Sequence, residues 1–278
     1  MWIDDGFKDY ELLDATGGER LERWGGYTLI RPDPQVIWHE PRRHERWRTA
    51  DAVYTRSRSG GGRWSSNTLP ASWNVSWRDL TFKVKPTGFK HTGLFPEQAA
   101  NWAVLRDSGA EKVLNLFAYT GAATAVCAGA GAKVTHVDAA KGMVAWAKEN
   151  AALNGLDARF LVDDCIAFVD RELRRGSRYD GILMDPPSYG RGPNGQVWKL
   201  EDDLYAFVKK TAGLLSETAR FFILNAYTTG LAPSVLRYML ECLIVPRFGG
   251  RVEAGELGLR VSATGLILPS GATGRWMK

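Results

Sequence analysis

The residues best suited to chemistry are Asp185-Pro186-Pro187-Ser188-Tyr189, which directly follow the apolar run 179–184. Each proline fixes its own φ and lacks an N–H, so the segment is stiff and cannot extend a strand ladder. Such a loop can hold the Asp185 carboxylate and backbone carbonyls toward a polar acceptor, while Tyr189 offers an aromatic face. A proline-rich strand terminator is the competing interpretation, and the motif alone leaves the two about equal.

Three further apolar runs end in residues that suit a ligand. Small residues in 118–124 let the backbone approach a bound molecule, and a helix start there presents free N–H groups. Asp138 ends the second run, where a carboxylate can accept both hydroxyls of an adenosine ribose. Asp163 and Asp164 end the third, where an acid can accept from the adenine amino group. Each acid alone could instead cap a helix, but the four segments together predict an adenosyl site with a second substrate beside it.

The elements that must position these residues alternate along the chain from residue 110. Helical patterns such as 141–154 separate short apolar runs, which predicts a parallel sheet with helices on both faces. The tail differs, because 256–261 and 263–269 read as neighbouring strands with no helix between them. An antiparallel hairpin would explain that pattern. The predicted parallel strands are 113–117, 133–137, 159–162, 179–184 and 220–224.

Residues 1–80 have another character and predict a β-rich accessory or substrate-binding region, with the catalytic domain at 81–278. They hold seven of the eleven tryptophans. Short runs at Tyr10–Leu13, Tyr27–Arg31 and Val36–Trp38 indicate small strands between tight turns.

Arginines and tryptophans alternate in this region, which is typical of an RNA-binding surface. The alternative is that the tryptophans fill a small core and the arginines pair with local acids, because residues 1–80 hold twelve Lys and Arg against twelve Asp and Glu. Both interpretations stay open. The residues concerned are Arg42, Arg43, Arg46, Arg48, Arg56, Arg58 and Arg63 with Trp38, Trp47 and Trp64.

The bulk composition bounds the class of protein. The chain has 278 residues, 45% of them hydrophobic, with a net charge of +5, which fits an anionic partner such as RNA without requiring one. No apolar window reaches the roughly 18 residues of a membrane span, so we expect a cytoplasmic protein with no membrane partner. Cys127, Cys165 and Cys242 are scattered and form no CxxC pair, which argues against a disulfide framework and a structural zinc. We expect no metal.

These motifs together resemble the class I S-adenosylmethionine-dependent methyltransferases, and within them the branch of large-subunit ribosomal RNA methyltransferases for cytosine C5 and guanine. The resemblance covers roughly residues 80–278. It rests on 114–121 for motif I, on Val137-Asp138, on Asp163-Asp164 and on the Asp185–Tyr189 segment. Residues 90–98 look like the family's Lys-Thr-Gly … Asp-Gln-Arg segment, which covers the methionine part of the cofactor. The resemblance implies a doubly wound, Rossmann-like α/β fold with a seven-stranded sheet whose last strand is antiparallel.

The resemblance also implies which residues act. S-adenosylmethionine is the implied cofactor, and RNA, in particular ribosomal RNA, is the implied partner. The implied catalytic residues are Asp185, Pro186, Pro187 and Tyr189. The implied cofactor-binding residues are Thr92, Gly93, Phe95, Gln98, Asn115, Phe117, Ala118, Tyr119, Thr120, Gly121, Asp138, Asp163, Asp164 and Asp185.

One departure from the branch concerns the acceptor atom. Cytosine C5 enzymes need a thiolate that attacks C6 of the base, and in this branch the cysteine follows strand five. Here that position reads Ala226-Tyr227-Thr228-Thr229, and the three cysteines are expected to be buried hydrophobes. Methylation at a base nitrogen is therefore favoured. The serine before Tyr189 also departs from the Asn-Pro-Pro-Tyr loops of amino methyltransferases, which puts the role of Tyr189 in doubt.

Several questions stay open at this level. The acceptor could be a protein amide or a small molecule, since a fold does not determine an acceptor. A non-catalytic RNA-binding protein with a vestigial pocket is less favoured, and an NAD-dependent dehydrogenase is weakened because GxGxxG is absent. The loop 190–199 is either a substrate rim or a plain surface loop. The sequence does not give the modified nucleotide or the oligomeric state.

Overall fold

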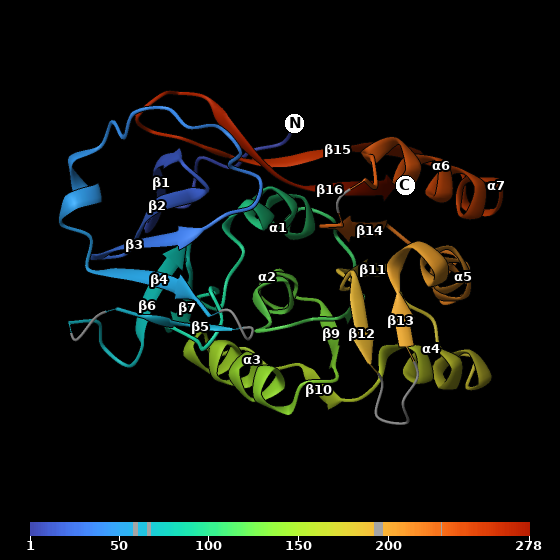
Figure 1. The fold of residues 1–278 in the computed structure, drawn as a ribbon. Helices are drawn as coiled ribbons and strands as arrows, with labels where there is room; N and C mark the ends of the chain where they lie inside the picture. The colour runs from blue at the N-terminus through green and yellow to red at the C-terminus, as the bar shows by residue number, and fades with distance from the viewer. Residues whose placement is uncertain (58–60, 66–67, 192–196, 229) are drawn as a thin grey trace. The chain divides into compact units, whose positions relative to one another are not determined.

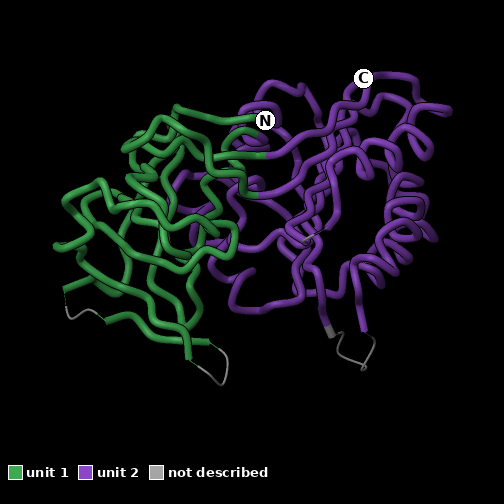
Figure 2. The backbone as a smooth tube through the Cα atoms, turned by 45° about the horizontal axis from the view of Figure 1, so that its top comes forward, with its two compact units in different colours: residues 1–100, 257–270 green, residues 101–256, 271–278 purple. Residues whose placement is uncertain are grey.

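The computed structural model describes residues 1–57, 61–65, 68–191, 197–228 and 230–278. The chain forms two compact units, which Figure 2 shows in different colours. Unit 1 comprises residues 1–100 and 257–270, and unit 2 comprises residues 101–256 and 271–278. No helix among the described residues is both long and apolar enough to cross a membrane.

A seven-stranded sheet organises unit 2 (Figure 1), in the order β10-β9-β8-β11-β14-β16-β15. Neighbours from β10 to β14 pair in parallel, whereas β16 pairs antiparallel with β14. This confirms the Rossmann-like α/β fold with an antiparallel last strand. The strands are β8 (Lys112–Leu116), β9 (Lys133–Asp138), β10 (Arg159–Val162), β11 (Gly181–Met184), β14 (Phe221–Ala226), β15 (Arg251–Arg260) and β16 (Ile267–Met277).

Helices lie on both faces of this sheet (Figure 1), with α2 and α3 on one face and α4, α5 and α6 on the other. The second face carries the main apolar core, where strand residues such as Leu116, Met184 and Leu224 pack with Phe168, Leu204 and Leu236. Burial of this surface is the main stabilising term of such a layer. The helices are α1 (Ala99–Arg106), α2 (Ala122–Gly129), α3 (Lys141–Leu153), α4 (Cys165–Arg174), α5 (Leu200–Ala212), α6 (Pro233–Leu243) and α7 (Val245–Phe248).

The predicted strands and the helix 141–154 are confirmed within a few residues, but the tail strands are longer than predicted. The second begins at Ile267 rather than at residue 263, after a turn in which the Val261 N–H donates to the Leu266 carbonyl at 2.8 Å. Its later part contains Gly271 and Gly274, and glycines are depleted in strands. A Cβ at Gly274 would lie 3.1 Å from the Leu236 Cβ, so the glycine lets β16 pass close to α6.

Unit 1 is β-rich, as predicted. A five-stranded sheet in the order β1-β2-β3-β4-β5 is accompanied by the hairpin β6–β7. The predicted strand at Val36–Trp38 is wrong, because that segment leaves a turn in which the Asp33 Oδ1 accepts from the Gln35 N–H at 2.9 Å. The strands are β1 (Tyr10–Thr16), β2 (Glu19–Trp24), β3 (Tyr27–Pro32), β4 (Ala52–Arg56), β5 (Gly62–Trp64), β6 (Trp73–Trp77) and β7 (Leu80–Val84).

Some tryptophans of unit 1 form a core, as the alternative to an RNA-binding surface predicted. Trp24, Trp47 and Trp77 are buried. Arg42 pairs with Glu19 at 2.7 Å and its guanidinium lies 4.3 Å from the centre of the Trp47 ring. Arg43, Arg46 and Arg48 of the same loop are also exposed, and they contact neither Glu19 nor the Trp47 ring in this way.

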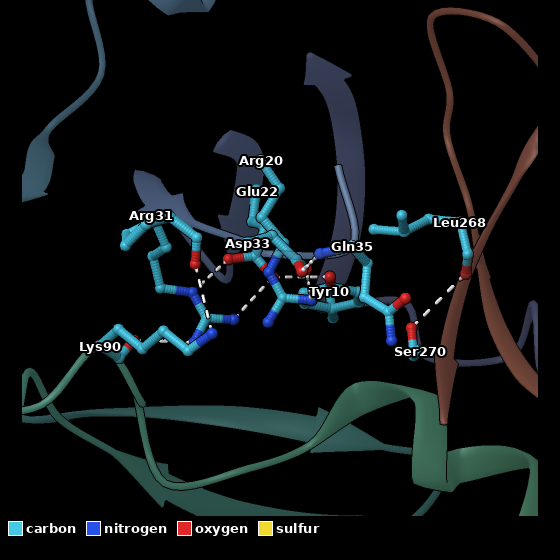
Figure 3. A network of polar contacts seen from close by, with 10 residues as sticks. Tyr10, Arg20, Glu22, Arg31, Asp33, Gln35, Lys90, Leu268 and Ser270 are labelled. Carbon is cyan, nitrogen blue, oxygen red and sulfur yellow. Dashed lines mark hydrogen bonds and ion pairs between the residues drawn. The ribbon is translucent and has the colours of Figure 1, made fainter. Parts of the chain in front are cut away.

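A buried ion network lies between β2 and β3 (Figure 3). Arg31 donates to both Glu22 oxygens at 2.5 and 2.7 Å, and the Tyr10 hydroxyl donates to the same carboxylate at 2.8 Å. Arg20 lies 3.3 Å from Glu22 and 3.4 Å from Asp33. Burial alone would raise the pKa of Glu22, but the charges of Arg20 and Arg31 and the hydrogen bonds from Arg31 and Tyr10 lower it to about 2. The carboxylate is therefore ionised and holds two buried cations.

We predict that Glu22→Gln lowers the free energy of unfolding by about 3–5 kcal/mol, because two arginines lose their buried counter-ion. In the wild type the Glu22 contribution is complete above pH about 4.5 and is lost as the pH falls toward about 2. The variant lacks that acid-dependent step. Urea unfolding between pH 3 and 7 measures both effects.

Glu19→Gln is the matched control, since Glu19 pairs with the half-exposed Arg42 at 2.7 Å. It is expected to change stability by less than about 1 kcal/mol. Equal losses in the two variants would show that the buried network does not contribute more than a surface pair.

Candidate active site

The four segments of unit 2 that are predicted to bind a ligand meet at one edge of its sheet, because the carboxyl ends of parallel strands lie together. Motif I follows β8, Asp138 is the last residue of β9, Asp163 follows β10 and Asp185 follows β11. Thr92, Gly93, Phe95 and Gln98 belong to unit 1, where they lead into and form the short helix η2 (Pro96–Gln98). Their part in the site remains a prediction.

The motif I loop has an unusual backbone conformation. Phe117 and Tyr119 have φ values of 54° and 52°, and Gly121 has a φ of 80°. A left-handed conformation at a bulky residue costs about 1–3 kcal/mol and persists only where surrounding contacts impose it. Strain of this kind concentrates at binding sites, which agrees with the predicted role of the loop.

Hydrogen bonds from neighbouring strand ends impose this conformation. The Ala118 N–H donates to the Val137 carbonyl at 3.1 Å, and the Tyr119 N–H donates to the Asp138 Oδ2 at 2.9 Å. The other oxygen of Asp138 accepts from the Ala140 N–H at 2.8 Å. A carboxylate has about four acceptor positions, so Asp138 retains capacity for the hydroxyls of a ribose.

Cys165 is a supporting residue that the sequence analysis missed. The Phe117 N–H donates to its Sγ at 3.3 Å, and its thiol lies 3.7 Å from the Val137 carbonyl. Burial raises the pKa of this thiol far above its usual value, so it stays protonated. Its burial was predicted, whereas its contact with motif I depends on how the loop after β8 meets the start of α4.

The expectation that all three cysteines are buried is wrong for Cys242. Cys127 is buried in α2, where burial raises its pKa to about 12. Cys242 is exposed near the end of α6, because it falls on the polar side of that amphipathic helix. Neither cysteine lies at the end of a sheet strand.

A buried polar chain lies beneath motif I. The Asn115 amide donates to the Thr124 Oγ1 at 2.9 Å, and this oxygen lies 2.9 Å from the His136 Nδ1. Burial lowers the pKa of His136 to about 4, so the ring is neutral at neutral pH and its Nδ1 can accept from the threonine hydroxyl. The side chain of Asn115 thus connects β8 to α2, and its predicted cofactor contact remains untested.

The two acids after β10 have different partners. The Asp164 Oδ1 accepts from the Ala167 N–H at 2.8 Å, so this residue is the N-cap of α4. Asp163 pairs with Arg171, and its N–H donates to the Asp138 carbonyl at 3.0 Å. The helix-cap interpretation therefore holds for Asp164.

The Asp185–Tyr189 loop follows β11 as predicted, and a tryptophan fixes it. The Trp198 Nε1–H donates to the Pro187 carbonyl at 2.6 Å, and the Leu200 N–H donates to the Ser188 carbonyl at 3.0 Å. The Trp198 ring packs 6.0 Å from that of Phe117. Tyr189 starts a short hairpin of β12 (Tyr189–Arg191) and β13 (Val197–Lys199), which places Trp198 against the loop.

In the Asp185–Tyr189 loop, the residues next to β11 are less exposed than Tyr189 at its far end. Pro186 is buried and Asp185 is half-buried, whereas Tyr189 is 52% exposed. The Ser188 and Thr228 hydroxyl oxygens lie 2.6 Å apart, which connects the loop to the end of β14. The predicted rim residues Asn194 and Gln196 and the predicted strand-five residue Thr229 lie outside the described residues.

We predict that Gly121→Ala weakens binding of S-adenosylmethionine at least about tenfold and lowers the free energy of unfolding by about 2–4 kcal/mol. The added Cβ would lie 2.7 Å from the Ala147 Cβ, at a φ of 80°. Movement of the α2 start would displace the N–H groups that face the predicted cofactor. Calorimetric titration with the cofactor measures the change.

Gly131→Ala is the matched control, because its φ is 93° and nothing lies within 4 Å of a built Cβ. It should cost about 1–2 kcal/mol of stability with no change in cofactor affinity. An unchanged affinity for Gly121→Ala would exclude the start of α2 from the site.

Comparison with known proteins agrees with this geometry. A family model for S-adenosylmethionine-dependent methyltransferases matches residues 48–228. A solved S-adenosylmethionine-dependent methyltransferase from Agrobacterium tumefaciens is 38% identical, with a TM-score of 0.93 over 99% of this chain and 92% of that chain.

Proteins similar to this chain in sequence include enzymes named as ribosomal RNA methyltransferases. The ribosomal RNA large subunit methyltransferase K/L of Shewanella sp. (strain MR-4) is 41% identical over 114 residues, which are 39% of this chain and 16% of that protein. The protein of the same name from Shewanella baltica (strain OS155) is 35% identical over 150 residues, 52% of this chain and 21% of that protein. The matches thus span about one fifth of the length of these relatives.

Since the family model covers more than half of the chain, the protein belongs to the S-adenosylmethionine-dependent methyltransferases and is an enzyme that uses this cofactor.

Proposed function

We propose that the enzyme methylates a nitrogen of an RNA base, with ribosomal RNA as the substrate. The Shewanella relatives named as ribosomal RNA methyltransferases support the substrate class. The acceptor loop after β11 supports a base as the methylated group, because it combines a carboxylate with an exposed aromatic ring.

We assign the cofactor to the carboxyl edge of the unit 2 sheet. Asp138 would hold the ribose, and the backbone of 117–121 would face the methionine part. Asp163 is the better adenine partner, because Asp164 already caps α4 through its Oδ1. The donor set suits S-adenosylmethionine, since the Gly121 N-cap of α2 has no side-chain hydrogen bond that would occupy the first N–H groups of the helix.

When bound, S-adenosylmethionine supplies an electrophilic methyl group on a sulfonium. The Asp185 carboxylate would accept hydrogen bonds from an exocyclic amine and orient its nitrogen for in-line transfer. Tyr189, 52% exposed beside it, would stack on a base that has left its helix. The hydrogen bond from Trp198 to the Pro187 carbonyl would restrain the loop between Asp185 and Tyr189.

Absence of a usable thiol at this edge favours nitrogen over cytosine C5. The end of β14, where the C5 enzymes of this branch carry their cysteine, presents Thr228 bonded to Ser188 at 2.6 Å. Burial keeps the Cys165 and Cys127 thiols protonated. Transfer to nitrogen needs no covalent adduct, so an acceptor loop of this composition suffices.

We predict that Asp185→Ala lowers the rate of methyl transfer by at least about a hundredfold with nearly unchanged cofactor affinity, because its carboxylate orients the acceptor. Single-turnover transfer and calorimetric cofactor titration separate the two quantities. Asp185→Asn keeps one carbonyl acceptor and should retain more activity than Asp185→Ala. An active Asp185→Ala variant would exclude this residue from the mechanism.

The proposed function is tested by transfer of labelled methyl from S-adenosylmethionine to RNA from a strain that lacks this gene, followed by nucleoside mass spectrometry. We expect a nucleoside methylated on a base nitrogen. Labelled 5-methylcytidine would contradict the argument from the missing thiol. Unlabelled RNA, with cofactor binding confirmed in the same sample, would favour a protein or small-molecule acceptor.

A further inference from the structure

A cavity lies at the edge of the unit 2 sheet opposite the candidate active site. It has a volume of about 530 Å³ and is lined by the first residues of β8, β9 and β10 and by the end of α4. Lys112, Lys133 and Arg159 begin these strands, whereas the cofactor residues follow the strands at their carboxyl ends. We call this cavity the amino-edge cleft.

The floor of the amino-edge cleft is a buried and satisfied polar cluster. Glu172 is 2% exposed and Tyr179 is 1% exposed. The Tyr179 hydroxyl donates to the Glu172 Oε2 at 2.9 Å, and Arg175 donates to the Glu172 Oε1 at 3.0 Å. The floor is therefore fixed, and its carboxylate is already bonded on both oxygens.

The rim of the cleft is cationic. Lys112, Lys133, Arg159 and Arg175 are exposed, against the exposed Asp157 and the buried Glu172. Lys112 and Lys133 are direct partners in the parallel pairing of β8 with β9, although like charges at such positions destabilise a sheet. Neither Lys133 nor Arg159 forms an ion pair with any part of the chain that the structure describes. The lining thus carries a net positive charge, because Glu172 and Asp157 offset only part of the four cationic side chains.

The lining favours phosphate groups over a base. Tyr179 supplies the aromatic ring of the cleft, but it is buried, and the Lys112 Nζ lies 4.7 Å above its centre. Ala132, Val134 and Ala158 complete the wall with small side chains. Exposed Lys and Arg side chains without a stacking surface suit the sugar–phosphate backbone, whose contacts carry no sequence information.

We propose that the amino-edge cleft binds backbone phosphates of an RNA strand, at a site separate from the methyl-transfer edge. The choice of RNA as the source of the phosphates rests on the proposed function. The contacts would add affinity and orient the substrate without selecting the modified base.

The test compares Lys133→Gln/Arg159→Gln with the wild-type chain in binding of a fluorescent twelve-nucleotide RNA at several salt concentrations. Loss of two phosphate contacts should weaken binding about tenfold at low salt. The slope of log K against log salt should fall by about 1.4 for single-stranded RNA. The effect should be equal for different base sequences. Lys148→Gln/Lys209→Gln is the matched control, because both lysines are exposed and neither lines the cleft.

The outcomes separate this proposal from the proposed function. RNA methylation by the wild type, together with equal RNA affinity of the cleft and control variants, would overturn the cleft proposal alone. Weaker RNA binding by the cleft variant, without methylation of any RNA, would support the cleft and contradict the proposed function. Adenosine monophosphate and inorganic phosphate are titrated in parallel. Tighter binding of either than of the oligonucleotide, lost in the cleft variant, would make the cleft a small-anion site and overturn the RNA assignment.

Discussion

The candidate active site depends on the hydrogen bond between the Tyr119 N–H and the Asp138 carboxylate, 2.9 Å long. It joins the loop after β8 to the end of β9 and keeps bulky residues in a left-handed conformation that an isolated chain would leave. The Cys165 thiol supports Phe117 in the same way from α4. A parallel sheet makes this possible, because it places three consecutive strand ends beside one another.

The acceptor loop, residues 185–189, is likewise held by a hydrogen bond from another segment. Two prolines make 185–187 stiff, but stiffness does not decide where the segment lies. Trp198 decides it, by donating to the Pro187 carbonyl at 2.6 Å while its ring packs against Phe117 and Phe207. Phe117 also belongs to the strained motif I loop, so the predicted cofactor loop and the predicted acceptor loop share one aromatic cluster.

The interior of unit 1 contains charged side chains beside its buried apolar residues, namely Glu22 with Arg20 and Arg31. Such a network contributes little net stability, but removal of one member leaves uncompensated charge. It also specifies the pairing of β2 with β3, because a shift of register would separate the charges. The exposed arginines of the loop 42–48 lie outside this network.

The sequence by itself determined the alternation of strands and helices, the order of ligand-binding motifs and the absence of a cysteine after β14, because these depend on local periodicity and residue identity. It did not determine the partners of the motif residues. Cys165 supports motif I and Trp198 holds the acceptor loop, and each of these two contacts joins segments that only packing brings together, whereas the cap that Asp164 forms with the Ala167 N–H is local. The amino-edge cleft shows the same limit. Its lysines and arginines are far apart along the chain, and only the parallel register of β8, β9 and β10 places their charges side by side.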